Sequence, residues 1–173
     1  MLTRAQLAAS IDHTLLRPTA TRAQIEVLCA EAREHGFASV CVQPARVALA
    51  RSCLMGQVPV CTVIGFPLGA SCPEIKAAEA YLAAEQGADE LDVVINLGLL
   101  RDGAHDEVVA DLAGVVTAAE GRLVKVILET ALLSPDEIDV ACGLAVAAGA
   151  HFVKTSTGFG PGGATVEAVA RMR

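Results

Sequence analysis

The sequence predicts an α/β fold, a (β/α)8 barrel of which about six βα units lie within the chain. Three observations lead to this prediction. Short apolar runs alternate with alanine-rich stretches of helical period, which is typical of parallel sheets with crossover helices. Three segments repeat a helix-ending glycine that is followed five residues later by a chemically unusual strand residue. No linker or low-complexity stretch divides the 173 residues, a length that suits one domain.

The apolar runs are the expected strands. They lie at Ile11–Leu16, Ser39–Gln43, Val58–Gly65, Glu90–Asn96, Leu123–Glu129 and Phe152–Ser156. The helices expected between them are Thr21–His35, Ala45–Met55, Pro73–Gln86, Ala104–Ala119 and Pro135–Ala148, and a last one begins within Gly163–Arg173. Two starts carry capping signals: Thr21 has a glutamine three residues later, and Ser134 precedes a proline and two acids.

The repeat aligns segments 35–41, 86–92 and 148–154 without gaps. In each, a glycine ends a helix and is followed by one residue of interest: Gly36 by Cys41, Gly87 by Asp92, and Gly149 by Lys154. These are strands two, four and six, and alternate strands of a (β/α)8 barrel contribute side chains to one interior layer. We therefore expect these three side chains to face one another. Lys125, on strand five, is expected in a neighbouring layer.

Six βα units are fewer than the eight that close such a barrel. Closed barrels typically need about 250 residues, and about 200 at least. An open six-stranded sheet would expose two edges and an apolar face. We therefore expect residues 1–173 to be a single barrel domain that is incomplete at its C-terminal end, a fragment of a longer protein.

Composition and charge exclude several classes of function. The net charge of −7 argues against nucleic acid or an anionic membrane as a partner. No apolar run reaches the length of a membrane span, and Met1–Ser10 lacks the apolar stretch of a secretory signal. The six cysteines are scattered and form no CxxC pair, which favours free thiols over a disulfide framework or a zinc site. We therefore expect a cytoplasmic protein without a metal.

Lys154 is one of three lysines beside ten arginines, and it lies within an apolar strand. A buried ammonium is costly unless it is neutral or paired, and lysine, unlike arginine, loses its proton readily once desolvated. A neutral amine is what imine formation with a carbonyl requires. Lys154 is therefore a candidate Schiff-base nucleophile. The structural alternative is a lysine that pairs with a carboxylate or reaches solvent at the strand end.

Lys125 and Asp92 are the charged residues expected closest to Lys154. Two ammonium groups about 6 Å apart repel by roughly 3 kcal/mol at an effective dielectric near 20, which lowers a pKa by about two and would keep Lys154 partly neutral. Asp92 could shuttle protons during imine formation. Alternatively, Lys125 balances the charge of Asp92 or Glu129, and Asp92 is a structural counter-ion.

Six motifs spread over the chain carry a family resemblance. They are Ile11–Leu15, Val40–Val42, Phe66–Gly69, Gly87–Val94, Lys125–Thr130 and Phe152–Gly158. In these motifs the chain resembles the deoxyribose-phosphate aldolases. The resemblance implies a TIM-barrel fold and a class I, Schiff-base aldolase that interconverts 2-deoxy-D-ribose 5-phosphate with acetaldehyde and D-glyceraldehyde 3-phosphate. It implies small phosphorylated substrates, no metal and no cofactor, and it leaves a homodimer open.

The resemblance also assigns roles to single residues. Lys154 is the Schiff-base lysine, Asp92 belongs to the proton relay, and Lys125 is the neighbouring lysine that perturbs Lys154. Three further side chains are expected to contact the substrate: Asp12, Cys41 and Thr155. The family carries another catalytic lysine on strand seven and phosphate-binding loops after strands seven and eight, which residues 1–173 do not include.

Two other functions remain open at this point. One is a different Schiff-base sugar-phosphate aldolase, of the transaldolase type. The other is a non-catalytic sugar-phosphate-binding barrel, in which Lys154 and Asp92 form an inert ion pair.

Overall fold

The structure is a computed structural model that describes residues 2–173. Its strands are β1 (Asp12–Leu15), β2 (Ser39–Val42), β3 (Val60–Ile64), β4 (Glu90–Val94), β5 (Leu123–Ile127) and β6 (Phe152–Lys154). The α-helices are α1 (Arg4–Ala8), α2 (Arg22–His35), α3 (Val47–Leu54), α4 (Pro73–Glu85), α5 (Leu97–Arg101), α6 (His105–Ala118), α7 (Pro135–Ala147) and α8 (Val166–Met172). Two 3-10 turns, η1 (Pro44–Arg46) and η2 (Thr130–Leu132), follow β2 and β5. All six predicted strands and every predicted helix are confirmed, with somewhat shorter ends.

Capping chemistry explains where the helices begin. Thr21 and Ser134 each form the predicted capping box, in which the side chain and backbone exchange hydrogen bonds with the residue three positions later. Helix α2 ends at Gly36, whose φ of +67° is the left-handed conformation that favours glycine.

Two short helices, α1 and α5, were not predicted from the sequence. Helix α1 starts at Thr3, which forms the same kind of capping box with Gln6. Helix α5 starts at Asn96, whose side chain accepts from the N–H of Leu99. Strand β4 therefore ends at Val94, before the predicted end at Asn96, because the asparagine caps the helix that comes next. Both caps are visible in the sequence, but helices of five residues are too short for a periodic apolar pattern.

The strands form one sheet with the order β1-β2-β3-β4-β5-β6. The pairs β1–β2, β2–β3 and β5–β6 are parallel, as the βα pattern predicts. These strands confirm the α/β class and the six expected βα units, whereas closure into an eight-stranded barrel stays a prediction. Within residues 2–173, no helix combines the length and the apolar character needed to cross a membrane.

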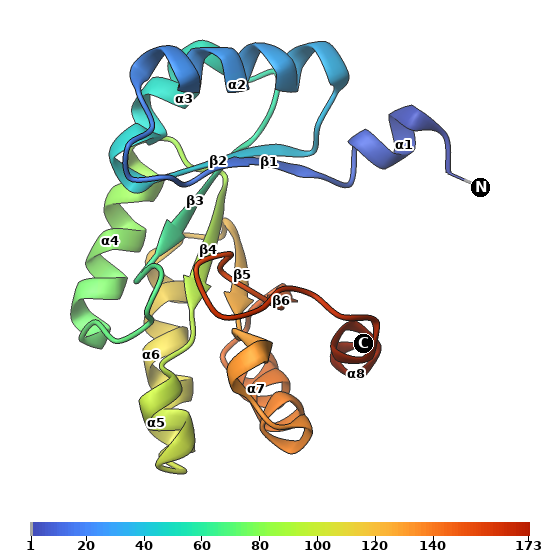
Figure 1. The fold of residues 1–173 in the computed structure, drawn as a ribbon. Coiled ribbons are helices and arrows are strands. Elements are labelled where there is room, and N and C mark those ends of the chain that lie inside the picture. Colours follow the sequence, from blue (N-terminus) through green and yellow to red (C-terminus); the bar gives the residue numbers. More distant parts are fainter. Residues whose placement is uncertain (1) are drawn as a thin grey trace. The chain divides into compact units, whose positions relative to one another are not determined.

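The chain separates into two compact units. The first unit runs to Val63 and includes Leu82–Leu91, and the second consists of Ile64–Tyr81 and Asp92–Arg173. In the first unit, α2 and α3 pack on each other and α2 lies along β1 and β2 (Figure 1). Every residue of β2 is buried there. The expectation of a single domain stays a prediction.

The second unit contains the two parallel strands β5 and β6 together with α5, α6, α7 and α8. Helix α7 packs between α6 and α8, and the chain ends in α8 (Figure 1). Strand β5 is buried except for its first residue, whereas the three residues of β6 are all at least partly exposed. Strand β6 is the last of the described strands in the sheet order, so in this part of the chain it is held along one side, by β5.

Candidate active site

Three charged side chains from β4, β5 and β6 meet in the second unit. Asp92 and Lys125 are the middle residues of β4 and β5, and Lys154 ends β6. Nζ of Lys125 donates a hydrogen bond to Oδ1 of Asp92 at 3.1 Å, and Nζ of Lys154 donates to Oδ2 of the same carboxylate. One carboxylate thus binds two ammonium groups. The predicted proximity of Asp92 and Lys154 is confirmed.

The register between β5 and β6 sets the positions of the two lysines. Lys125 lies opposite Phe152, and Ile127 lies opposite Lys154. The two lysines are therefore displaced by two residues along the strands, which agrees with the neighbouring layers expected from the sequence. Because side chains two residues apart on a strand point to the same face, this displacement lets both amines approach the carboxylate of Asp92.

Burial differs sharply among the three side chains. The side chain of Asp92 is fully buried, that of Lys125 is 10% exposed, and that of Lys154 is 33% exposed. A buried carboxylate is tolerated when donors satisfy both oxygens, and the two ammonium groups do so here. Of the three, only Lys154 has an amine on a substantially exposed side chain, as an amine that condenses with a substrate requires.

This arrangement is suited to Schiff-base chemistry. A carboxylate in contact with an amine can accept its proton and return it to a leaving hydroxyl group. The second ammonium, on the other carboxylate oxygen, places a positive charge beside the first. An inert ion pair would make the same contacts, and the exposure of Lys154 is the feature that favours a reactive amine.

A second ion pair lies in the same unit and is completely buried. Nζ of Lys76, on α4, donates to Oδ2 of Asp111, on α6, at 2.6 Å, and both side chains are 0% exposed. The same Nζ donates to the backbone carbonyl of Val94 at 3.0 Å. Val94 is the last residue of β4 and lies two residues after Asp92. Lys76 therefore ties the end of the strand that carries Asp92 to α4 and α6.

Two of the expected substrate contacts lie in the first unit. Asp12 accepts a hydrogen bond from Oγ of Ser39 at 2.9 Å, and Cys41 is a buried residue of β2 that lies opposite Thr14 and Cys61 in register. A buried cysteine without a disulfide is ordinary in a core. The contact of Asp12 and Cys41 with substrate, and the alignment of Cys41 with the cluster around Asp92, stay predictions.

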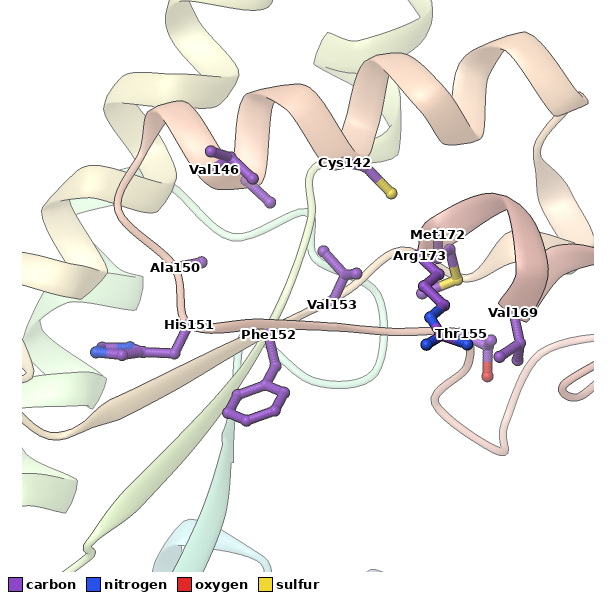
Figure 2. A pocket seen from close by; sticks show the side chains of 11 residues that line it. Cys142, Val146, Ala150, His151, Phe152, Val153, Thr155, Val169, Met172 and Arg173 are labelled. Atoms are coloured by element: carbon purple, nitrogen blue, oxygen red, sulfur yellow. The ribbon is translucent and has the colours of Figure 1, made fainter.

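Thr155 has a different environment from its neighbour Lys154. Figure 2 shows a cavity of about 460 Å³ that is lined by residues of α7, β6 and α8. Its lining is largely apolar and includes Cys142, Val146, Phe152, Val153, Thr155 and Val169. None of the three charged residues of the cluster is among its lining residues in the described part of the chain. Burial raises the pKa of the Cys142 thiol. The contact of Thr155 with substrate stays a prediction.

Known aldolases match most of the chain in sequence. The family model described as DeoC/LacD family aldolase matches residues 7–172. The chain belongs to this aldolase family. The deoxyribose-phosphate aldolase of Halalkalibacterium halodurans is 58% identical over 170 residues, which cover 96% of the chain and 76% of that protein. That of Geobacillus sp. is 59% identical over 169 residues, with the same coverage.

A solved structure has the same fold as this member of the aldolase family. The deoxyribose phosphate aldolase from Aeropyrum pernix, whose structure is tetrameric, is 37% identical and superposes with a TM-score of 0.88. The match covers 98% of this chain and 72% of that one.

Sequence reasoning missed two buried polar pairs of this aldolase, Lys76 with Asp111 and Glu129 with Thr157. Both left signals in the sequence. Asp111 stands on the apolar stripe of α6, whose other buried members are hydrophobic, and Lys76 is one of only three lysines. Glu129 lies two residues after the end of β5, in an apolar stretch where a carboxylate needs a partner. No sequence signal identifies the partner, because the partners lie 28 and 35 positions away.

Proposed function

We propose that this chain carries the Schiff-base chemistry of a deoxyribose-phosphate aldolase, which interconverts 2-deoxy-D-ribose 5-phosphate with acetaldehyde and D-glyceraldehyde 3-phosphate. The family and the names of its relatives support this reaction. The observation that carries the proposal is Lys154: its side chain is one-third exposed, and its Nζ contacts the buried carboxylate of Asp92. Lys154 is the nucleophile in this proposal.

In the direction of synthesis, a proton passes from Lys154 to Asp92, and the neutral amine attacks the carbonyl carbon of acetaldehyde. The resulting carbinolamine loses its hydroxyl group as water, with the proton returned by Asp92, and an imine remains. Asp92, ionised again, takes an α-proton through a water molecule, which converts the imine to an enamine. The nucleophilic carbon of the enamine adds to the aldehyde carbon of glyceraldehyde 3-phosphate, and the new alkoxide takes the proton held by Asp92. Water then hydrolyses the new imine to release the sugar phosphate and the free amine.

Lys125 acts electrostatically in this proposal. Its ammonium donates to Oδ1 of Asp92, whereas Lys154 donates to Oδ2, and its side chain is more buried than that of Lys154. A fixed positive charge next to Lys154 disfavours a second one, so the reactive amine gives up its proton more easily. Asp92 keeps one oxygen for proton transfer while the other stays paired.

Net charge and cysteine content bear on the partners and the location of the protein. The net charge of −7 argues against nucleic acid as a partner, whereas small phosphorylated sugars and aldehydes can bind at a site that is locally positive. The six cysteines are free thiols, which supports a cytoplasmic location. A homodimer is the assembly that we propose to test first, by light scattering coupled to size-exclusion chromatography.

The proposal is tested by trapping the imine. The 173-residue chain is treated briefly with acetaldehyde and borohydride, digested, and mapped by mass spectrometry. We expect an N-ethyl group on Lys154, because hydride reduces the imine to a stable secondary amine. Lys76, which is fully buried, serves as an internal control and is expected to stay unmodified. In the Lys154→Arg variant, which keeps the positive charge but forms no imine, the fast adduct should disappear.

The same experiment separates the rival functions. A ketose phosphate that is trapped on Lys154 more efficiently than acetaldehyde would support a transaldolase-type enzyme instead. If neither carbonyl compound is trapped faster on Lys154 than on the α-amino group of the chain, Lys154 and Asp92 form an inert ion pair and the proposal is wrong.

A further inference from the structure

Glu129 is a buried carboxylate with an unusual backbone, next to the strand that carries Lys125. It lies two residues after the end of β5, is only 4% exposed, and has φ +54° and ψ +58°, the left-handed region that residues other than glycine rarely adopt. Burial of a carboxylate and a left-handed backbone are both unfavourable, so the surrounding structure must fix this residue firmly. The partners of Glu129 show which segment it holds.

The carboxylate of Glu129 binds the loop after β6. Its Oε2 accepts from the backbone N–H of Thr157 at 3.2 Å and from the hydroxyl of the same threonine. The Thr157 Oγ1 in turn accepts from the N–H of Phe159 at 3.0 Å. Thr157 is itself buried and lies three residues after Lys154. One carboxylate and one hydroxyl therefore define the path of the loop directly after the reactive lysine.

Gly160 completes this arrangement. A Cβ atom at Gly160 would lie 2.7 Å from Cδ of Glu129, so the loop passes directly over the carboxylate and leaves no room for a side chain. The other carboxylate oxygen, Oε1, is buried and has no hydrogen-bond partner among the described residues.

The backbone on either side of Glu129 binds Lys154 and Thr155. The N–H of Leu128 donates to the carbonyl of Lys154 at 2.9 Å, and the N–H of Thr130 donates to the carbonyl of Thr155 at 2.8 Å. Strand β6 has only three residues, all partly exposed. The position of the end of such a short strand depends strongly on how the next loop is anchored. The side chain of Glu129 binds that loop, and the backbone N–H of the preceding residue, Leu128, binds the carbonyl of Lys154.

We propose that Glu129 is a positioning residue of the aldolase site: through Thr157 it fixes the end of β6, and with it the direction in which Lys154 reaches Asp92. The inference rests on the proposed function of Lys154. Glu129 need not touch the substrate, and its effect is transmitted through the loop. A misplacement of about 1 Å in a reacting group can lower a rate by about 100-fold, so loss of this contact should act on the rate of imine formation more than on affinity.

Two pairs of variants test the proposal, each read by the rate of acetaldehyde trapping on Lys154 per folded molecule. Thr157→Val removes the hydroxyl that binds Glu129, and Thr157→Ser keeps it. Gly160→Ala pushes against the carboxylate, whereas Gly163→Ala, in the same loop, meets no atom within 4 Å and is the matched control. We expect Thr157→Val and Gly160→Ala to lower the maximum rate by roughly tenfold to 100-fold, with the half-saturating acetaldehyde concentration little changed. Thr157→Ser and Gly163→Ala should trap at rates close to the parent.

A merely structural role gives a different result. Thr157→Val and Gly160→Ala would then lower the urea midpoint, but the folded molecules would trap acetaldehyde at the parent rate, which would overturn the proposal.

A second readout needs no aldolase activity: the pH dependence of Lys154 acetylation by acetic anhydride. In Thr157→Val we expect its midpoint to move to lower pH, because an ammonium displaced from Asp92 loses its favourable partner. If the parent chain fails to trap acetaldehyde, the proposed function falls, and an unchanged acetylation midpoint in Thr157→Val would then overturn the positioning role independently.

Discussion

Removal of the buried ammonium of Lys76 should strongly destabilise the protein. The substitution Lys76→Met keeps an unbranched side chain of similar length but leaves the Asp111 carboxylate without its donor. Both side chains are 0% exposed, and Oδ1 of Asp111 already lacks a partner among the described residues. The variant would therefore bury a carboxylate with no described donor at either oxygen.

The magnitude depends on the groups that each variant leaves without a partner. Breaking a buried ion pair on one side costs about 3–5 kcal/mol, a large share of the roughly 5–15 kcal/mol that holds a typical domain folded. In the double variant Lys76→Met with Asp111→Leu no charge is stranded. Only the hydrogen bond to the carbonyl of Val94 is then lost, at about 1 kcal/mol. The double variant should therefore be more stable than the single one by about 2–4 kcal/mol.

Urea unfolding monitored by circular dichroism measures these differences. With a slope near 2 kcal/mol per molar urea, the single variant should unfold at a midpoint roughly 2 M lower than the parent, and the double variant at one about 0.5 M lower. A midpoint for Lys76→Met within about 0.5 M of the parent, or a double variant no more stable than the single one, would contradict the role of the Lys76–Asp111 pair in stability.

Three further predictions concern the rest of the molecule. At Gly69, which has φ +69°, a Cβ would lie 2.1 Å from the carbonyl oxygen of Ile95. Gly69→Ala should therefore destabilise the protein by more than about 3 kcal/mol in the same urea experiment. A loss of stability below about 1 kcal/mol would contradict this close approach of the two backbone segments. The backbone N–H of Ser134 donates to Glu137 and holds the pKa of that carboxyl below its ordinary value of 4.5. The parent should therefore be more stable than Glu137→Gln above that pH, and this difference in stability should disappear as the pH falls through the lowered pKa. Urea midpoints that differ equally at about pH 7 and about pH 3 would contradict this. Burial raises the pKa of Cys29 to about 11, so its alkylation by iodoacetamide at about pH 8 should occur only after unfolding, as peptide mapping would show, and rapid labelling in the native protein would disprove it.

The sequence was informative about elements and weak about partners. The apolar runs and the caps at Thr21 and Ser134 predicted the strands and helices correctly, because these signals are local. The repeat placed Asp92 and Lys154 on β4 and β6 facing the same cluster, and the structure confirms that they meet. The spacing could not reveal that Lys125 and Lys154 share one carboxylate, since a contact across 33 or 62 positions depends on how the strands are paired.

The two buried polar pairs also show that the sequence does not identify the partner of a buried charge. Lys76 stands out in the sequence as one of three lysines, but its role depends on Asp111, which lies 35 positions later on another helix. The sequence suggests Glu129 only as an alternative partner for Lys125. Glu129 has a left-handed backbone, and its side chain binds Thr157 in the loop after β6. A left-handed conformation at a glutamate has no sequence signature.

The amino-acid sequence alone determined the α/β class and the six βα units and made Lys154 the candidate amine, because periodicity, capping and the rarity of lysine are properties of the chain itself. Tertiary structure decided which charges share a carboxylate, which lysine is exposed enough to react, and which buried acid holds the loop beside it. The physical reason is that a charge inside a protein is defined by its neighbours: the desolvation of Asp92, Asp111 or Glu129 is offset by donors that only folding brings within hydrogen-bonding distance.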